Sequence, residues 1–196
     1  PNPGLTVVEI AHAALHGTIK GMYMMGENPF LSDPNINKVR KALANLEFLV
    51  VQDIFLTETA EFADVILPAS SFPEKEGTYT NTDRRVQLGR KAIDSPGQAR
   101  PDWQIICDIA TRMGYPMRYS SPKEVFQELA ALSPNLAGLR YERLGTTGEL
   151  WPCPDPDQPG QSVIFIDSFP KGRGKFVPAE FAPANELPDT EYPLVL

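Results

Sequence analysis

The chain has few of the residues that usually hold metals. Only 2 of its 196 residues are cysteine and 2 are histidine. Cys107 and Cys153 form no Cys-x-x-Cys pair, so they cannot by themselves hold zinc or an iron–sulfur cluster. We interpret them as buried thiols in a reducing compartment and expect the protein in the cytoplasm. His12 and His16 have the i, i+4 spacing of a metal pair, but no third ligand is near and a solvated helix face is favoured.

Long apolar runs, positive charge and the common nucleotide signatures are also scarce. No stretch reaches the roughly 18 apolar residues that a membrane helix requires, so we expect no membrane span. The first residues lack a charged segment followed by an apolar one, and no signal peptide is expected. The net charge of −7 disfavours nucleic acid as a partner, because phosphate binding favours a basic surface. The sequence has no Gly-x-Gly-x-x-Gly, no P-loop, no Gly-x-Ser-x-Gly and no recognisable nucleophile–base pair.

Short apolar strands alternate with amphipathic helices in the first half of the chain. Continuous apolar strands with short connections are typical of a parallel sheet with helices on both faces. The predicted fold class is therefore α/β, and a ligand is expected outside the carboxyl ends of the strands. Asp33 and Pro34 are predicted to cap and begin the second helix. The predicted strands span 21–25, 48–51 and 65–67, and the predicted helices span 6–16, 35–46 and 57–63.

The turns after these strands are polar. Gly26 and Asn28 follow the first strand, where glycine permits close approach of a ligand, although an ordinary turn also explains them. Asp53 follows the second strand, and its carboxylate could accept two hydrogen bonds from a guanine or cap the next helix. Thr57 could bind a phosphate or sugar oxygen, and capping explains it equally well. The residues alone leave these alternatives open.

The segment from Glu74 to Gln87 is rich in charged, hydroxyl and amide side chains. We predict it to be a loop that holds a polar ligand. Lys75 could reach a phosphate as a point charge or pair with the glutamates on either side. Arg84 and Arg85 are adjacent, so on a strand they would face opposite sides. Asp102 stands where a helix starts, and N-capping is the alternative to a ligand contact.

The second half of the chain has a different organisation. Its apolar ending, residues 192–196, is predicted to be the first strand of a further domain, so the chain is interpreted as a fragment. The predicted division is an α/β domain at 1–118 and a helical, proline-rich extension at 119–196. Predicted elements are helices at 102–113 and 121–132, a helical turn at 141–144, a proline-rich loop at 151–160, and β-prone pieces at 163–166 and 175–181.

Five sequence blocks occur in a characteristic order. The blocks are Met24–Pro29, Val50–Thr59, Ala63–Pro68, Glu74–Gln87 and Pro101–Trp103. Together they resemble the molybdopterin oxidoreductase family and, within it, most closely the catalytic subunit of formate dehydrogenase. The core of the similarity covers residues 5–115, and a weaker similarity continues to Pro193.

The resemblance implies a fold like the third domain of formate dehydrogenase and DMSO reductase, an α/β unit that binds one of two pterin–guanine dinucleotides. It implies that Gln52 and Asp53 contact the guanine end of the cofactor. By the same resemblance, the charges of Glu74, Arg84 and Arg85 hold their loop in shape. The complete set of implied cofactor-binding residues is Gly26, Glu27, Asn28, Gln52, Asp53, Thr57, Lys75 and Asp102.

The resemblance also implies what would lie outside this chain. The molybdenum ligand, its neighbouring histidine, the catalytic arginine and the iron–sulfur cysteines would be upstream, so no catalytic or metal residue is assigned here. The whole enzyme would carry molybdenum in bis-molybdopterin guanine dinucleotide and an iron–sulfur cluster, and would oxidise formate to carbon dioxide. Expected partners are the pterin cofactor, the remaining domains of the parent subunit and electron-transfer subunits. The alternatives are a nitrate reductase, the large subunit of a respiratory NADH dehydrogenase, or a non-catalytic nucleotide-binding domain.

Overall fold

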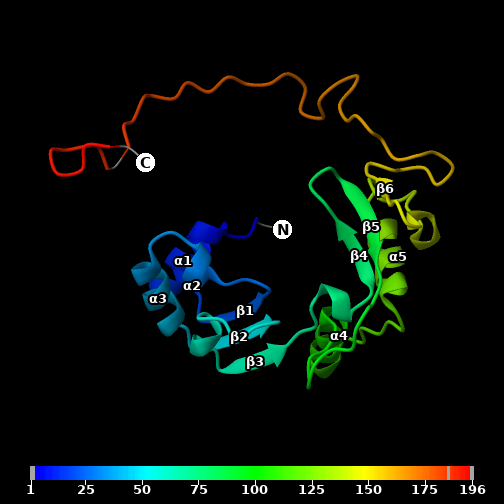
Figure 1. Ribbon diagram of the computed structural model, residues 1–196, viewed down its shortest axis with the longest axis horizontal. Coiled ribbons are helices and arrows are strands. Elements are labelled where there is room, and N and C mark those ends of the chain that lie inside the picture. Colours follow the sequence, from blue (N-terminus) through cyan, green and yellow to red (C-terminus); the bar gives the residue numbers. More distant parts are fainter. Residues whose placement is uncertain (1–2, 185, 195–196) are drawn as a thin grey trace. The chain divides into compact units, whose positions relative to one another are not determined.

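The computed structural model describes residues 3–184 and 186–194. The chain divides into two compact units, Pro1–Ser162 and Val163–Leu196 (Figure 1). The first unit holds every helix and strand of the described residues, and the second runs without regular secondary structure. The predicted site residues therefore all lie in the first unit.

A parallel sheet of three strands forms the centre of the α/β part. The strands are β1 (Gly21–Met25), β2 (Phe48–Asp53) and β3 (Val65–Pro68), in the order β1-β2-β3. All pairs are parallel, and Met25 of β1 lies opposite Gln52 of β2. The predicted α/β fold class is confirmed. Strand β2 extends two residues beyond the predicted end, so the polar Gln52 and Asp53 belong to the strand itself.

Helix α1 (Val7–Leu15) begins where the sequence predicts. Thr6 caps it in a reciprocal capping box, in which the backbone N–H of Thr6 donates to the Glu9 carboxylate at 2.7 Å. The predicted helix at 57–63 is wrong in extent. Only a 3-10 turn, η1 (Ala60–Phe62), forms there, and Thr57 accepts a hydrogen bond from the backbone N–H of Ala60 at 3.2 Å.

The predicted start of the second helix is also wrong. Helix α3 (Ile36–Ala44) is capped by Asn35, whose side chain accepts from the backbone N–H of Lys38 at 3.2 Å. Asn35 has a φ of 65°, a left-handed conformation that asparagine tolerates better than most residues. Asp33 instead ends an extra short helix, α2 (Pro29–Ser32), which the sequence pattern did not predict.

One face of the sheet carries the hydrophobic core of this part. Val39 and Leu43 of α3 pack against Leu49 and Val51 of β2, which are 1% and 0% exposed. Each such buried side chain stabilises the fold by about 1.5–3 kcal/mol. Helix α1 packs beside α3. On the other face, Tyr23 of β1 and Phe48 of β2 are exposed, along with their apolar neighbours Met25 and Val65.

The polar segment from Glu74 to Gln87 is a β-hairpin, which corrects its prediction as a loop. Strand β4 (Gly77–Thr80) pairs antiparallel with β5 (Arg85–Gly89), and β5 also pairs with the short β6 (Glu149–Leu150). A 3-10 turn, η2 (Phe72–Glu74), precedes the hairpin. Arg84 ends the hairpin turn with a φ of 70°. A run of hydroxyl, amide and charged residues hides the alternating pattern by which strands are recognised.

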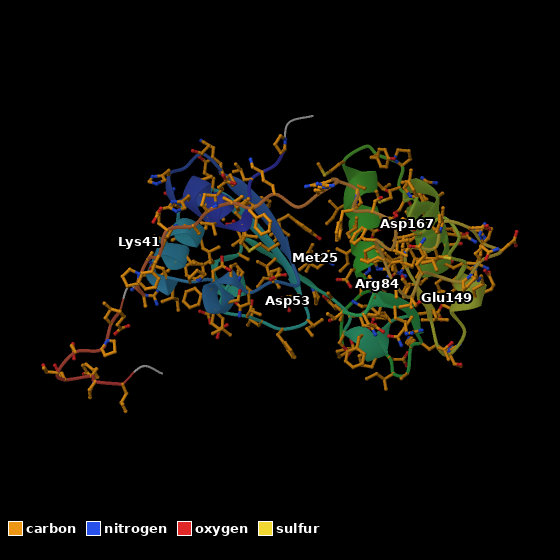
Figure 2. All side chains as sticks on the ribbon, turned by 90° about the horizontal axis from the view of Figure 1, so that it is seen from above. Met25, Lys41, Asp53, Arg84, Glu149 and Asp167 are labelled. Carbon is orange, nitrogen blue, oxygen red and sulfur yellow. The ribbon has the colours of Figure 1, made fainter. Side chains whose placement is uncertain are left out.

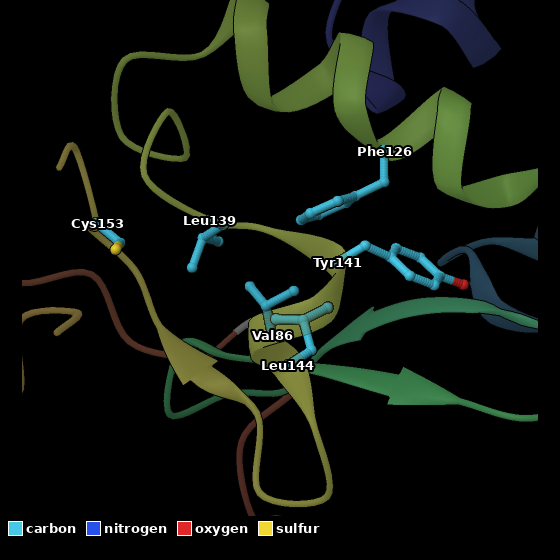
Figure 3. Close-up of a cluster of buried hydrophobic side chains, with 6 residues drawn as sticks. All are labelled: Val86, Phe126, Leu139, Tyr141, Leu144 and Cys153. Atoms are coloured by element: carbon cyan, nitrogen blue, oxygen red, sulfur yellow. The ribbon is translucent and has the colours of Figure 1, made fainter. Parts of the chain in front are cut away.

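Two helices and a short turn complete the first unit. Helix α4 (Asp102–Arg112) and helix α5 (Pro122–Leu132) match the predictions, and η3 (Tyr141–Leu144) follows. Asp102 is the first residue of α4 and Pro101 occupies the cap position, so the capping interpretation of Asp102 is wrong. Figure 3 shows a second hydrophobic cluster formed by Val86, Phe126, Leu139, Tyr141, Leu144 and Cys153.

Arginine side chains fasten the proline-rich loop that spans residues 151–162. Arg84 donates hydrogen bonds to the backbone carbonyls of Trp151, Gln161 and Ser162, the last two at 3.0 and 2.9 Å. Arg143 donates to the carbonyl of Gln158 at 2.9 Å. The planar guanidinium suits this role because its donors diverge in a fixed geometry. Arg84 therefore shapes the proline-rich loop, whereas the resemblance implied that it shapes its own segment, Glu74–Gln87.

The second unit corrects three further predictions. The β-prone pieces at 163–166 and 175–181 form no strand, and Phe176 is 98% exposed. Strands need partners to bury their apolar side chains, and this segment has none among the described residues. Of the predicted terminal strand at 192–196, residues 195 and 196 lie outside the described part, and 192–194 are not a strand. Within the described residues, no helix has the length and apolar character to cross a membrane.

Candidate functional site

The carboxyl ends of β1 and β2 meet at one edge of the sheet. The backbone N–H of Gly26 donates to the carbonyl of Gln52 at 2.9 Å, which ties the turn after β1 to the end of β2. Gly26 has a φ of 66°, a region that favours glycine, and open space surrounds the position that a Cβ would take. Figure 2 shows Met25 and Asp53 at these neighbouring strand ends. The structure thus brings together the polar ends of β1 and β2, where the sequence analysis expects a ligand.

Asn28 joins the turn after β1 to the loop after β2. Its Oδ1 accepts from the hydroxyl and the backbone N–H of Thr59 at 2.7 and 3.3 Å, and its Nδ2 donates to Glu58 at 2.8 Å. The bond from Asn28 lowers the pKa of the Glu58 carboxyl. Thr59, which sequence reasoning missed, is 0% exposed. Both ends of the Asn28 amide are occupied by protein, so this residue shapes the edge, while Glu27 beside it is exposed.

Gln52, Lys75 and Asp102 form one hydrogen-bonded chain. Nε2 of Gln52 donates to Oδ1 of Asp102 at 2.7 Å, and the Lys75 ammonium donates to Oδ2 of the same carboxylate. Gln52 is fully buried, and the side chains of Lys75 and Asp102 are 23% and 28% exposed. Asp102 lies at the first turn of α4, where the helix dipole favours a negative charge. Three residues far apart in the sequence are therefore held as a unit.

Tyr23 is a fourth member of this chain that sequence reasoning missed. Its hydroxyl donates to Oε1 of Gln52 from the adjacent strand. Burial raises the pKa of the Tyr23 phenol, and the charge of Asp102 raises it further. The sequence did hold a signal, because Tyr23 is the one side chain with a polar tip in the strand Gly-Met-Tyr-Met-Met.

Asp53 keeps part of its carboxylate free. Oδ1 accepts from the backbone N–H of Phe55 at 3.1 Å, and Oδ2 has no hydrogen-bond partner among the described residues. The first bond fixes the turn after β2, as aspartate often does. The Thr57 hydroxyl accepts from the backbone N–H of Ala60. Among the described residues, no hydrogen bond links Thr57 to Asp53. The exposed Phe55, 72% accessible, lies between them.

Two hollows lie near these residues. Lys75 and Asp102 line one of about 230 Å³, together with Trp103 and Phe126. The other, about 390 Å³, lies among α1, β1 and α3, and only Glu27 of the predicted site residues lines it. The first is the hollow associated with the hydrogen-bonded chain, since it holds the cation and the carboxylate. No group of three or more metal-ligating side chains occurs in the part of the chain that the structure describes.

Comparison with known proteins identifies relatives over the whole chain. The alpha subunit of F420-dependent formate dehydrogenase 2 from Methanococcus maripaludis is 49% identical over 98% of this chain and 29% of its own length. Formate dehydrogenase H from Escherichia coli is 44% identical over 98% of this chain and 28% of its own length. The assimilatory nitrate reductase catalytic subunit of Bacillus subtilis is 42% identical over 100% and 29%. The chain thus spans less than a third of the length of these relatives.

A structural neighbour agrees at the level of the fold. Acetylene hydratase from Pelobacter acetylenicus superimposes with a TM-score of 0.59 at 19% identity, covering 71% of this chain and 20% of that protein. The family described as molybdopterin oxidoreductase matches residues 1–112, a range that includes the polar strand ends, Lys75 and Asp102. This match and the similarity to the formate dehydrogenases show that the chain belongs to the molybdopterin oxidoreductase family.

Proposed function

We propose that this chain supplies part of the binding site for a molybdopterin guanine dinucleotide in a formate dehydrogenase catalytic subunit. The formate dehydrogenase relatives, at 44–49% identity, support this assignment. The reaction of the whole protein is the oxidation of formate to carbon dioxide with release of one proton and two electrons. The molybdenum–pterin group, when bound, would supply the acceptor for those two electrons. The residues of this chain contribute binding and orientation, not catalysis.

The observation that carries the proposal is the free oxygen of Asp53 at the carboxyl edge of the sheet. A guanine presents two neighbouring N–H donors, and a carboxylate can accept both at once. Among the described residues, Asp53 keeps one oxygen without a partner and is held in place by the backbone of Phe55. Ligands of parallel α/β sheets bind at this edge. The residues present therefore fit the guanine end of the cofactor.

The neighbouring residues suit the remaining parts of a dinucleotide. Lys75 has three N–H donors and gives one to Asp102, so two remain for a phosphate. Gly26 permits a close backbone approach, since nothing occupies the space where a side chain would be. Glu27, Asn28 and Thr57 line or shape the same edge, and their contact with the cofactor stays a prediction.

The wider setting of the chain follows from the same proposal. Residues 1–118 form part of the dinucleotide-binding domain, and 119–196 lead toward further domains of the parent subunit. Those domains hold a second pterin dinucleotide, molybdenum and an iron–sulfur cluster, and electron-transfer subunits receive the electrons. The buried state of both cysteines supports a reducing compartment such as the cytoplasm.

Substitution of Asp53 by asparagine in the full-length protein tests the proposal. Asparagine can still accept from the backbone of Phe55, so the turn is kept, but its amide offers a donor where guanine needs an acceptor. We expect Asp53→Asn to lower the guanine nucleotide recovered per protein on denaturation. Asp94→Asn, at a side chain that is 95% exposed, is the matched control and should retain full occupancy. Full occupancy in Asp53→Asn would exclude the guanine role.

A nitrate reductase is the second candidate function. It is favoured by the 42% identity of the Bacillus subtilis assimilatory nitrate reductase over the full chain. The two candidates share the dinucleotide site and differ in the substrate of the whole protein. Turnover of formate, compared with reduction of nitrate by the same purified full-length protein, separates them.

A further inference from the structure

The direction of the Gln52 carboxamide is decided by its neighbours. A carboxamide has a donor end and an acceptor end of nearly the same shape, so a half-turn exchanges them. Asp102 is a carboxylate and only accepts hydrogen bonds, so the amino end of Gln52 faces it at 2.7 Å. The carbonyl end then faces Tyr23, and the phenol is the donor of that bond.

The phenol is suited to remain a donor. Burial and the Asp102 charge both raise the pKa of Tyr23, so its proton is retained at neutral pH. Tyr23 thus donates to Gln52, and Gln52 and Lys75 both donate to the carboxylate of Asp102. In this hydrogen-bonded series the Gln52 carboxamide cannot make a half-turn without setting its oxygen against the carboxylate of Asp102.

Two donors hold the Asp102 carboxylate. Its oxygens accept from Gln52 and from Lys75. Because Gln52 is 0% exposed, the groups of this cluster that can still donate to a ligand are the two remaining N–H groups of Lys75. A ligand therefore meets Lys75, in the position that Asp102, Gln52 and Tyr23 impose.

We infer that Tyr23 is a positioning residue of the cofactor site, which holds Gln52 against Asp102 and thereby keeps the Lys75 ammonium in place for the dinucleotide. The inference rests on the proposed function, because Lys75 must contact the cofactor for its position to matter. Without the Tyr23 hydroxyl the carbonyl end of Gln52 loses its donor, and the carboxamide is free to rotate away from Asp102. Asp102 pairs directly with Lys75 and is a second positioning residue.

The test is the rate at which the full-length holoenzyme releases its cofactor, followed by the fluorescence of the free pterin. Tyr23→Phe removes only the hydroxyl and should accelerate release about tenfold, as expected when a buried acceptor loses its donor. In a Gln52→Leu background the same substitution should change the rate less than about twofold, because the group it acts through is gone. Tyr115→Phe, at a ring that is 65% exposed, is the control and should leave release unchanged.

Each outcome separates this inference from the proposed function. Equal acceleration by Tyr23→Phe in both backgrounds would show that Tyr23 acts independently of Gln52, which overturns the inference. The inference also fails alone if Tyr23→Phe has no effect while Gln52→Leu and Asp53→Asn accelerate release. If none of the three substitutions changes release or occupancy, the cofactor does not bind at this edge, and the proposed function falls together with the inference. A spectroscopic titration of the phenols checks the geometry, because Asp102→Asn should lower the pKa of Tyr23.

Discussion

Exchanging the carboxamide of Gln52 with the carboxylate of Asp102 should reveal the direction of the hydrogen bonds that link Tyr23, Gln52, Asp102 and Lys75. In Asp102→Asn, one oxygen of the carboxylate becomes an amino group. If the remaining oxygen accepts from Lys75, the new amino group faces the amino end of Gln52, and two donors oppose each other. If the remaining oxygen accepts from Gln52 instead, the new amino group faces the Lys75 ammonium, and again two donors oppose each other. One hydrogen bond is lost in either case, as long as Gln52 keeps the bond that it accepts from Tyr23.

The loss of this hydrogen bond should lower the free energy of unfolding by a predictable amount. A hydrogen bond to a charged group contributes about 1.5–3 kcal/mol, and partial exposure of this pair reduces the expected cost to about 1–2 kcal/mol. Gln52→Glu alone places two carboxylates against each other at a site that is 0% exposed, and should also destabilise the fold. When both substitutions are combined, the hydrogen bond between the two positions can form again. The amide introduced at position 102 donates to the carboxylate introduced at position 52, and its oxygen still accepts from Lys75.

Urea unfolding of the chain, followed by the fluorescence of Trp103 beside Asp102, measures these effects. We expect the double variant to be more stable than the sum of the two single variants predicts, by about 1–2 kcal/mol. Additive costs, within about 0.5 kcal/mol, would refute the reasoning, because independent sites add to that accuracy. Lys75 stays unchanged in all four proteins, so the comparison isolates the two exchanged side chains.

Three further outcomes are expected. Leu144→Ala, at a side chain that is 0% exposed, should lower the free energy of unfolding by about 2–5 kcal/mol, whereas Leu132→Ala, at 76% exposure, should change it by less than about 0.5 kcal/mol in the same denaturation assay. Arg84→Lys should speed proteolysis of the proline-rich loop, because one ammonium nitrogen replaces the two guanidinium nitrogens that donate to the three carbonyls in a fixed geometry. The hydrogen bond to Glu128 raises the pKa of Tyr119 from 10.0 to about 12, so ultraviolet titration should show Glu128→Gln ionising this phenol at lower pH. Because the folded pKa is raised, the stabilising effect of that bond is complete below pH 10.0 and is lost as pH rises to about 12.

Local sequence patterns predicted the elements that depend on neighbouring residues. The strand at 21–25 and the helix after Ser121 occur as expected, because an apolar run and a cap followed by proline act over a few residues. The hairpin at 77–89 was missed, since its pairing depends on residues that face each other across a turn. The pieces at 163–166 and 175–181 had the composition of strands, but composition does not supply a partner.

In the candidate site, too, some contacts could be predicted from local sequence patterns and others depend on residues far apart in the sequence. The convergence of Gly26 with Gln52 and Asp53 follows from parallel strands and could be predicted. The bond between Gln52 and Asp102 could not, because it links β2 to the first turn of α4 across 50 positions of the sequence. Which atoms of a predicted residue remain available to a ligand depends on such contacts, and these become known only with the fold.

The position of β2 in the middle of the sheet has a consequence for the protein as a whole. Its backbone is paired with β1 on one side and β3 on the other, and its inner face is the packed core. Amides in such a strand exchange with solvent only when the surrounding unit opens. A ligand held at the end of β2 adds its binding free energy to the cost of that opening. Loading with cofactor would therefore slow exchange at Leu49 and Val51, which pack against α3 in the core.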